Sequence, residues 1–179
     1  TGKRILLIDR DEKKKNDRTW CFWEKGEGFF EPVVYHNWKS IGFFSNDYNA
    51  QMEIAPYCYK MIRGADFYQY CFNEFNKHPN IEFITGEVNF TNSGNSFQLY
   101  LDNSIIDTSG SIVFNSIYKA SPPTAKTLHV LQHFKGWLIS SVTDVFDPAK
   151  ATMMDFRVHQ QHGTSIVYVL PFTKREALV

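Results

Sequence analysis

The sequence lacks the features that mark several classes of protein. Cysteine occurs only as Cys21, Cys58 and Cys71. This odd number without a CxxC pair argues against a disulfide framework or a structural zinc site and suits a reducing compartment. No apolar run approaches the roughly 20 residues that a membrane-spanning helix needs, and no signal-peptide pattern is present. The six histidines show no metal-ligand spacing, so we expect no metal and no membrane span.

The sequence also has no excess of charge of either sign. Nineteen Lys and Arg residues balance nineteen Asp and Glu residues, and no basic cluster recurs after Lys13 to Lys15. A nucleic-acid-binding surface requires a basic patch or stripe, so we exclude nucleic acid as a partner. Aromatic residues, in contrast, make up 16% of the 179 residues. They are enough for one sizeable core and for the walls of an apolar pocket.

Hydrophobic patterns in the first half predict an α/β sheet. Residues Ile5 to Ile8 form a short apolar run flanked by charge, which is typical of a strand buried on both faces of a parallel sheet. Residues 66–77 place apolar side chains three and four positions apart, which predicts a helix with Asp66 as its N-cap. Pro79 marks its end. The segment IEFITGEV then predicts another strand, and this order of elements suits an α/β sheet.

The other segments predict antiparallel structure. Residues 33–45 combine β-branched and aromatic residues without helical spacing, so we expect them to be extended. Residues 89–116 alternate apolar and polar side chains between turn signals, which predicts a β-meander. Beyond the break at SPPTAK, the segments GWLISSVTDVF, ATMMDFRVHQ and TSIVYVLPF predict three strands of a separate antiparallel sheet.

The first predicted strand ends in an acid, Asp9. In dinucleotide-binding sheets, a carboxylate at this position accepts hydrogen bonds from the adenosine ribose, about 20 residues after a glycine-rich turn. Asp9 lies too close to Thr1 for such a turn to precede it. Two interpretations stay open here: Asp9 is a solvated strand end, or the chain is a fragment whose first strand and phosphate loop lie outside it.

Four segments, taken in order, point to one family. NDRTWCFW is followed far downstream by FKGW, FDPAKATMMDFRV and YVLPFTKREALV. Together these strings resemble the lycopene cyclase family of carotenoid flavoproteins, and the resemblance covers residues 9–179. It implies an α/β (α+β) fold of the hydroxylase-like flavoprotein type. Residues 1–32 and 60–120 would form part of a Rossmann-like FAD-binding sheet, and residues 33–59 and 121–179 an antiparallel substrate-binding β-platform.

The resemblance implies a cofactor role for three residues. Asp9 would bind the ribose of FAD, Arg63 would lie near the cofactor, and the main chain of Val88 would meet the adenine. An ordinary ion pair for Arg63 and ordinary strand core for Val88 are the alternatives. Asn115, in SIVFNSIY, stands where such flavoproteins usually carry an acid in a strand, and an amide supplies no negative charge.

The family also implies chemistry without net oxidation. An acid protonates the terminal double bond of a linear polyene, a neighbouring double bond attacks the cation, and proton loss closes the ring. Reduced FAD, with NAD(P)H as reductant, would act by electrostatics. Asp155 is the candidate catalytic residue, because desolvation among apolar neighbours would raise its pKa; the alternative is a buried acid paired with Arg157 or with an amide. Aromatic faces stabilise a carbocation. The candidate pocket-wall residues, which are otherwise core, are Trp20, Phe22, Trp23 and Trp137.

On this resemblance the chain is the middle of a longer bacterial enzyme, with the phosphate loop before it and the family's catalytic acidic motif after Val179. We expect an intramolecular lyase or isomerase that receives a membrane-dissolved carotene. It would lie in the cytoplasm or at the inner face of the cytoplasmic membrane. We expect the chain alone not to hold FAD, and no oligomeric state follows from the sequence. Two alternatives stay open: an FAD-dependent aromatic hydroxylase of the same fold, and a non-catalytic module that binds a hydrophobic ligand.

Overall fold

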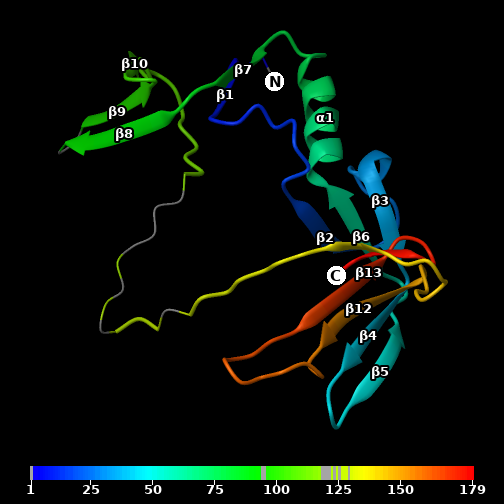
Figure 1. Cartoon of the computed structure of the whole chain (residues 1–179). Helices are drawn as coiled ribbons and strands as arrows, with labels where there is room; N and C mark the ends of the chain where they lie inside the picture. Colours follow the sequence, from blue (N-terminus) through cyan, green and yellow to red (C-terminus); the bar gives the residue numbers. More distant parts are fainter. Residues whose placement is uncertain (1, 94–95, 118–121, 123, 125, 129) are drawn as a thin grey trace. The chain divides into compact units, whose positions relative to one another are not determined.

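The computed structural model describes residues 2–93, 96–117, 122, 124, 126–128 and 130–179. These residues form a mixed α+β structure, mostly strands in antiparallel sheets, with one α-helix among them (Figure 1). The chain divides into two compact units, residues 1–14 with 71–132 and residues 15–70 with 133–179. The boundary falls within helix α1, Gly64–Phe75. The expected assignment of residues to cofactor and substrate binding stays a prediction.

The first unit contains a parallel pair of strands. β1, Ile5–Asp9, pairs with β7, Ile81–Thr85, with Asp9 opposite Thr85. Phe72, in the last part of α1, packs edge-on against Phe83, with 4.9 Å between the ring centroids. The strand predicted from the apolar run and its parallel pairing are therefore confirmed, and α1 contributes an aromatic contact to β7. The expected burial on both faces is wrong, because Ile5 and Leu6 are 41% and 43% exposed.

A β-meander follows β7 in the first unit. It consists of β8, Val88–Ser93, β9, Ser96–Leu101, and β10, Ser104–Ile106, each antiparallel to the next. Asp102 and Asn103 form the turn between β9 and β10 with φ angles of 47° and 71°, a left-handed conformation that Asp and Asn tolerate. The predicted meander is confirmed as far as Ile106.

The strand expected at SIVFNSIY is wrong for its described residues. Residues 111–117 pair with no strand, and Phe114 is 91% exposed. The side chain of Asn115 accepts a hydrogen bond of 2.9 Å from the backbone N–H of Ile117, a local turn that competes with strand pairing. Tyr118 lies outside the described residues. High β-propensity alone did not make a strand here, because propensity reflects packing against neighbouring strands.

The second unit contains a three-stranded antiparallel sheet with the order β2-β6-β3. Its strands are β2, Thr19–Glu24, β6, Cys58–Arg63, and β3, Val34–Trp38, and a short 3-10 helix, η1, Glu31–Val33, precedes β3. Side chains alternate between the two faces of a strand. Trp20 and Phe22 therefore share one face of β2, and Trp23 lies on the other.

A six-stranded sheet in the same unit has the order β11-β14-β13-β12-β4-β5 (Figure 1). Its strands are β11, Leu138–Ser140, β14, Glu176–Leu178, β13, Val167–Pro171, β12, Lys150–Asp155, β4, Ser40–Phe44, and β5, Asn49–Glu53. Each of the three predicted segments contains a strand, and β12 and β13 are antiparallel as expected. The expectation of a purely antiparallel sheet is wrong, because β12 pairs in parallel with β4.

The core of the second unit links these two sheets. Trp38, at the end of β3, is fully buried, and its indole Nε1 donates a hydrogen bond of 2.9 Å to the carbonyl oxygen of Pro171 on β13. The shared buried residues are Trp38, Ile41, Tyr59, Met61, Ala151 and Leu170. Both sheets of this unit therefore contribute to one hydrophobic core.

Helix α1 starts two residues earlier than its apolar spacing predicts. Its first residue is Gly64, whose backbone N–H donates a hydrogen bond of 2.8 Å to the carbonyl oxygen of Arg18. A Cβ atom at Gly64 would lie 3.0 Å from that same oxygen, so glycine permits this close approach. Asp66 is consequently not the N-cap but an acid in the first turn, where it interacts favourably with the helix dipole.

Candidate functional site

Asp155 lies at the carboxyl end of β12. Because β12 and β4 are parallel, their ends meet, and Asp155 pairs with Phe44, the last residue of β4. The backbone N–H of Phe156 continues this pairing with a hydrogen bond of 2.8 Å to the carbonyl oxygen of Phe44. The Asp155 side chain is 21% exposed. The parallel pairing thus places a partly buried carboxylate beside an aromatic residue from a distant part of the sequence.

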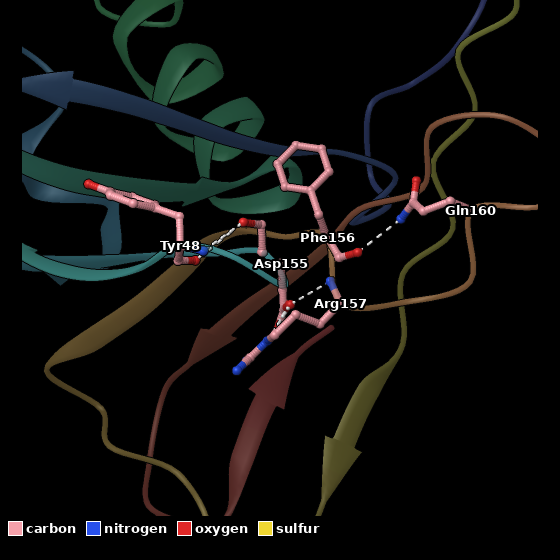
Figure 2. A network of polar contacts seen from close by, with 6 residues as sticks. Tyr48, Asp155, Phe156, Arg157 and Gln160 are labelled. Atoms are coloured by element: carbon pink, nitrogen blue, oxygen red, sulfur yellow. Dashed lines mark hydrogen bonds and ion pairs between the residues drawn. The ribbon is translucent and has the colours of Figure 1, made fainter.

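Arg157 binds both oxygens of the Asp155 carboxylate (Figure 2). Its Nε donates to Oδ1 at 2.9 Å and its Nη2 donates to Oδ2 at 2.7 Å. The backbone N–H of Arg157 donates a third hydrogen bond, 3.0 Å long, to Oδ1. The carbon at the centre of the guanidinium lies 4.5 Å from the centroid of the Phe44 ring. Asp155, Arg157 and Phe44 therefore form one cluster.

The expectation that the pKa of Asp155 is raised is wrong. The side-chain hydrogen bonds from Arg157 lower this pKa below its ordinary value of 3.8; the opposing effect of partial burial is smaller. Asp155 is therefore an ionised carboxylate at neutral pH, and the alternative interpretation, pairing with Arg157, is confirmed. Its participation in catalysis stays a prediction.

Gln160 braces the loop that carries Arg157 (Figure 2). Its amide nitrogen Nε2 donates to the carbonyl oxygens of Phe156 at 3.0 Å, Val158 at 3.0 Å and Ser165 at 2.7 Å. Its Oε1 accepts a hydrogen bond of 2.9 Å from the backbone N–H of Ser165. Sequence analysis missed Gln160, because hydrogen bonds from one amide side chain to its own loop leave no periodic signal.

Aromatic side chains surround this end of the sheet. The ring of Phe43 on β4 lies 5.5 Å from that of Phe156 and 6.0 Å from that of Tyr48, between centroids. Tyr48 is 55% exposed and lies in the β4–β5 turn, where its N–H donates a hydrogen bond of 3.1 Å to Oγ of Ser45. The carboxylate of Asp155 therefore lies at an end of the sheet that is rich in aromatic surface.

The four predicted pocket-wall residues do not share one face. Trp20 packs against Phe67 of α1, with 4.9 Å between centroids, and Phe22 lies on the same face of β2. Trp23 lies on the other face, 4.9 Å from the ring of Tyr59. Trp137 precedes β11 and is 57% exposed. These four residues consequently do not line a single wall, and a substrate contact for any of them stays a prediction.

Arg63, at the end of β6, is already paired within the second unit. Its Nε and Nη2 donate to the two carboxylate oxygens of Asp66 at 2.6 and 3.1 Å, and its guanidinium lies 4.0 Å from the centroid of the Tyr35 ring. The hydrogen bonds that Arg63 donates to Asp66 raise the pKa of Arg63 above its ordinary value. An anionic ligand would have to share this guanidinium with Asp66.

Asp9 and the segment before Val88 meet at the carboxyl end of the β1–β7 pair. The backbone N–H of Gly86 donates a hydrogen bond of 3.0 Å to the carbonyl oxygen of Asp9, and β8 begins at Val88. A Cβ atom at Gly86 would lie 2.4 Å from Cδ1 of Leu101, so a larger residue in this turn would displace the Leu101 side chain. The structure thus brings together two of the three predicted cofactor residues.

The carboxylate of Asp9 has local partners. Oδ1 accepts a hydrogen bond of 2.9 Å from the backbone N–H of Asp11, and Oδ2 lies 2.9 Å from Nζ of Lys13. Partial burial raises the pKa of Asp9, but the Asp11 N–H and the Lys13 ammonium together outweigh that effect and lower it below 3.8. Asp9 therefore presents an ionised acceptor at the end of a parallel strand.

Lys60 is a charged residue that sequence analysis missed. It lies in β6 with 3% of its surface exposed, and its Nζ donates to Oε2 of Glu24 at 2.9 Å, to the carbonyl oxygen of Gly26 at 2.6 Å and to Oε2 of Glu31. A lysine inside the apolar strand CYKMIR was the available signal. Every acceptor lies between Glu24 and Glu31, so this lysine ties the segment between β2 and β3 to the sheet.

The described residues contain no group of three or more His, Cys, Asp and Glu side chains that could hold a metal ion. Within the same residues, no helix has the length and hydropathy required to span a membrane.

Comparison with known proteins places the chain in a family. A search of curated proteins and a search of solved structures find no match. The family model described as "Lycopene cyclase protein" matches residues 1–179. The match extends over both compact units, including the Asp155–Arg157 cluster and the Asp9 turn. The chain therefore belongs to the lycopene cyclase family.

Proposed function

We propose that this chain is part of an enzyme that closes rings at the end groups of a linear carotene. A proton adds to the terminal double bond, the electron pair of a neighbouring double bond attacks the resulting cation, and loss of a proton from the ring restores a double bond. The product is an isomer of the substrate, so the enzyme is an intramolecular lyase. Family membership over residues 1–179 is the observation that carries the proposal.

Within this reaction, Asp155 acts as an anion. Its hydrogen bonds to Arg157 and its lowered pKa make it a poor initiating acid, so the first proton comes from another group. A fixed carboxylate stabilises developing positive charge, and this effect is large where water is excluded. Oδ2 accepts one N–H, whereas Oδ1 accepts two. Because a carboxylate oxygen has two lone pairs, Oδ2 keeps the capacity to face the cation.

The aromatic side chains beside Asp155 suit a polyene. Phe43 contacts Tyr48 edge-on and Phe156 at a tilt, and Phe44 lies under the guanidinium of Arg157. Aromatic faces bind extended apolar chains and stabilise cations. We propose that the carotene reaches this end of the sheet from a membrane surface on the cytoplasmic side.

The residues of the first unit fit the adenosine half of FAD. The carboxyl end of parallel strands is where dinucleotides bind in such sheets, and an ionised acid there accepts hydrogen bonds from the ribose. Asp9 has this position and charge state, and the turn at Gly86 and Val88 lies beside it. Reduced FAD, when bound, would supply negative charge that stabilises the cation without net electron transfer.

Product analysis tests this function. The protein that contains this chain would be produced in bacterial cells that accumulate lycopene, and the carotenes would be separated by chromatography and weighed by mass spectrometry. We expect cyclic carotenes of unchanged mass. Products that gain an oxygen atom would favour the aromatic-hydroxylase alternative, and lycopene that is bound but unchanged would favour the ligand-binding module.

A further inference from the structure

The hydrogen bonds between Arg157 and Asp155 fix the carboxylate in one plane. Two nearly parallel N–H···O bonds, of 2.9 and 2.7 Å, join the guanidinium edge to the two carboxylate oxygens, the bidentate arrangement in which arginine gives geometric specificity. The third bond, from the backbone N–H of Arg157, reaches Oδ1. Rotation of the carboxylate would break at least one of these bonds.

The guanidinium itself is held in place from other directions. It lies over the ring of Phe44, the β4 residue that pairs with Asp155. The amide of Gln160 binds the carbonyl oxygens of Phe156 and Val158, the two residues that flank Arg157; Figure 2 shows the bond to Phe156. The main chain on both sides of Arg157 is therefore anchored by one side chain, and its side chain is anchored by an aromatic ring.

Arg157 is the cation that faces Asp155. The strand residues paired with Asp155 are Phe44 on β4 and Val167 on β13, and both are uncharged. Besides Arg157, the titratable groups of the adjoining turns are Asp47, Tyr48, His159 and His162. In the part of the chain that the structure describes, no ion pair joins Asp155 to a histidine. The charge state of Asp155 therefore depends chiefly on Arg157.

We propose that Arg157 is a positioning residue for ring closure, which holds the Asp155 carboxylate ionised and oriented toward the developing cation. The inference rests on the proposed function and adds to it a residue that acts through Asp155. A merely structural ion pair at this exposure, with 47% of the Arg157 side chain in solvent, would contribute little to stability and nothing to turnover.

Two substitutions separate charge from geometry. Arg157→Gln removes the positive charge and the guanidinium group that donates two hydrogen bonds to Asp155. We expect kcat to fall roughly 10- to 100-fold, because the effect of a catalytic carboxylate depends strongly on its orientation. The acidic limb of the pH–rate profile should move to higher pH. Arg157→Lys restores the charge without the planar fork, so we expect the acidic limb to return toward that of the wild type while kcat stays reduced. KM should change little in either variant.

Arg175→Gln is the matched control. Arg175 forms an ion pair of 2.6 Å with Asp144 in the same unit and is 59% exposed, so its loss should leave the rate and the pH profile unchanged. Wild-type kcat and pH dependence in Arg157→Gln would overturn the inference. An effect confined to KM, or equal effects in the Arg157→Gln and Arg175→Gln variants, would overturn it too.

A second measurement keeps this test independent of the proposed function. Carbon-detected NMR titration of the Asp155 carboxyl group in the same protein should show a higher pKa in Arg157→Gln than in the wild type. An unchanged titration would overturn the inference even where ring closure is observed. If the wild type yields no cyclic carotene, the proposed function fails, and the titration still decides whether Arg157 controls the ionisation of Asp155. Should Arg157→Gln not fold, the lysine variant provides both readouts.

Discussion

At the scale of single residues, Lys60 shows how one buried charge can hold a segment of chain. Its ammonium group has three acceptors and is nearly inaccessible to water. Burial lowers the pKa of Lys60, but the hydrogen bonds that its ammonium group donates to Glu31 and Glu24 outweigh this effect and raise the pKa above 10.5. Its contribution to stability is therefore complete below about pH 10.5 and is lost as the pH rises through the raised pKa.

Lys60→Met should destabilise the protein by roughly 3 kcal/mol, because it leaves Glu24 and Glu31 without their cation. Urea unfolding at neutral pH measures the change. Lys77→Met, which removes an exposed pair with Glu74, should leave the unfolding midpoint nearly unchanged. Equal midpoints for both variants would show that Lys60 has no such role.

Asp155→Asn tests the role of the anion in the proposed reaction. The substitution keeps the shape and one acceptor oxygen but removes the charge, so ring closure should slow by ~10²-fold or more. In the longer protein that contains this chain, bound flavin and the fold should be retained. The measurement pairs carotene product analysis with thermal unfolding of the same variant. A lower melting temperature with unchanged turnover would leave Asp155 only a structural partner of Arg157.

Single residues also show which features of the candidate site could be predicted from the sequence. Pairing of Asp155 with Arg157 was one of two open alternatives, because the residues lie two positions apart. The choice between them depended on the rotamer of Arg157 and on Phe44, more than 100 positions away in the chain. The direction of the pKa shift follows from that geometry and not from the apolar neighbours in sequence. Asp9 was found because it marks the end of a strand, which is a local signal.

At the scale of elements, apolar patterns located strands better than they located strand partners. The patterns for β12 and β13 were sufficient, because a short apolar run is visible in a single segment. The parallel partner of β12 is β4, and no pattern within either strand specifies this pairing. β14, with three residues, is too short to show a period. The start of α1 at Gly64 was missed because a contact with Arg18 determines it.

Gln160→Ala tests the loop brace between β12 and β13. Loss of the amide removes three donated hydrogen bonds and the acceptor for the N–H of Ser165. These groups are exposed, so water replaces much of the lost bonding, and global stability should fall by only about 1 kcal/mol. Local opening should become easier, and hydrogen exchange at Ser165 should accelerate clearly. Gln161→Ala, next to it in the same exposed loop, is the control. Equal exchange rates in both variants would show that the Gln160 side chain does not stabilise the loop.

At the scale of the whole molecule, the second unit is discontinuous. It combines residues 15–70 with residues 133–179, and its six-stranded sheet joins β4 and β5 from the first segment to four strands from the second. Such non-local pairing has a high cost in loop closure before contacts form, and it slows folding. The family match covers both segments, but no local pattern in the sequence states that they form one core.

Limited proteolysis tests whether this discontinuous unit holds together without its covalent connection. Lys135 is exposed and lies outside any strand, three residues before β11 begins at Leu138, so trypsin should cleave the native protein there. The C-terminal fragment should stay bound to residues 15–70, because β12 pairs with β4 and the indole of Trp38 binds the carbonyl oxygen of Pro171. Native gel filtration with mass spectrometry should find both fragments in one peak. Trp38→Ala removes a fully buried side chain at a cost of roughly 3–5 kcal/mol, and the nicked variant should separate into its fragments. Separation of the nicked wild-type protein would instead show that the two segments depend on their covalent link.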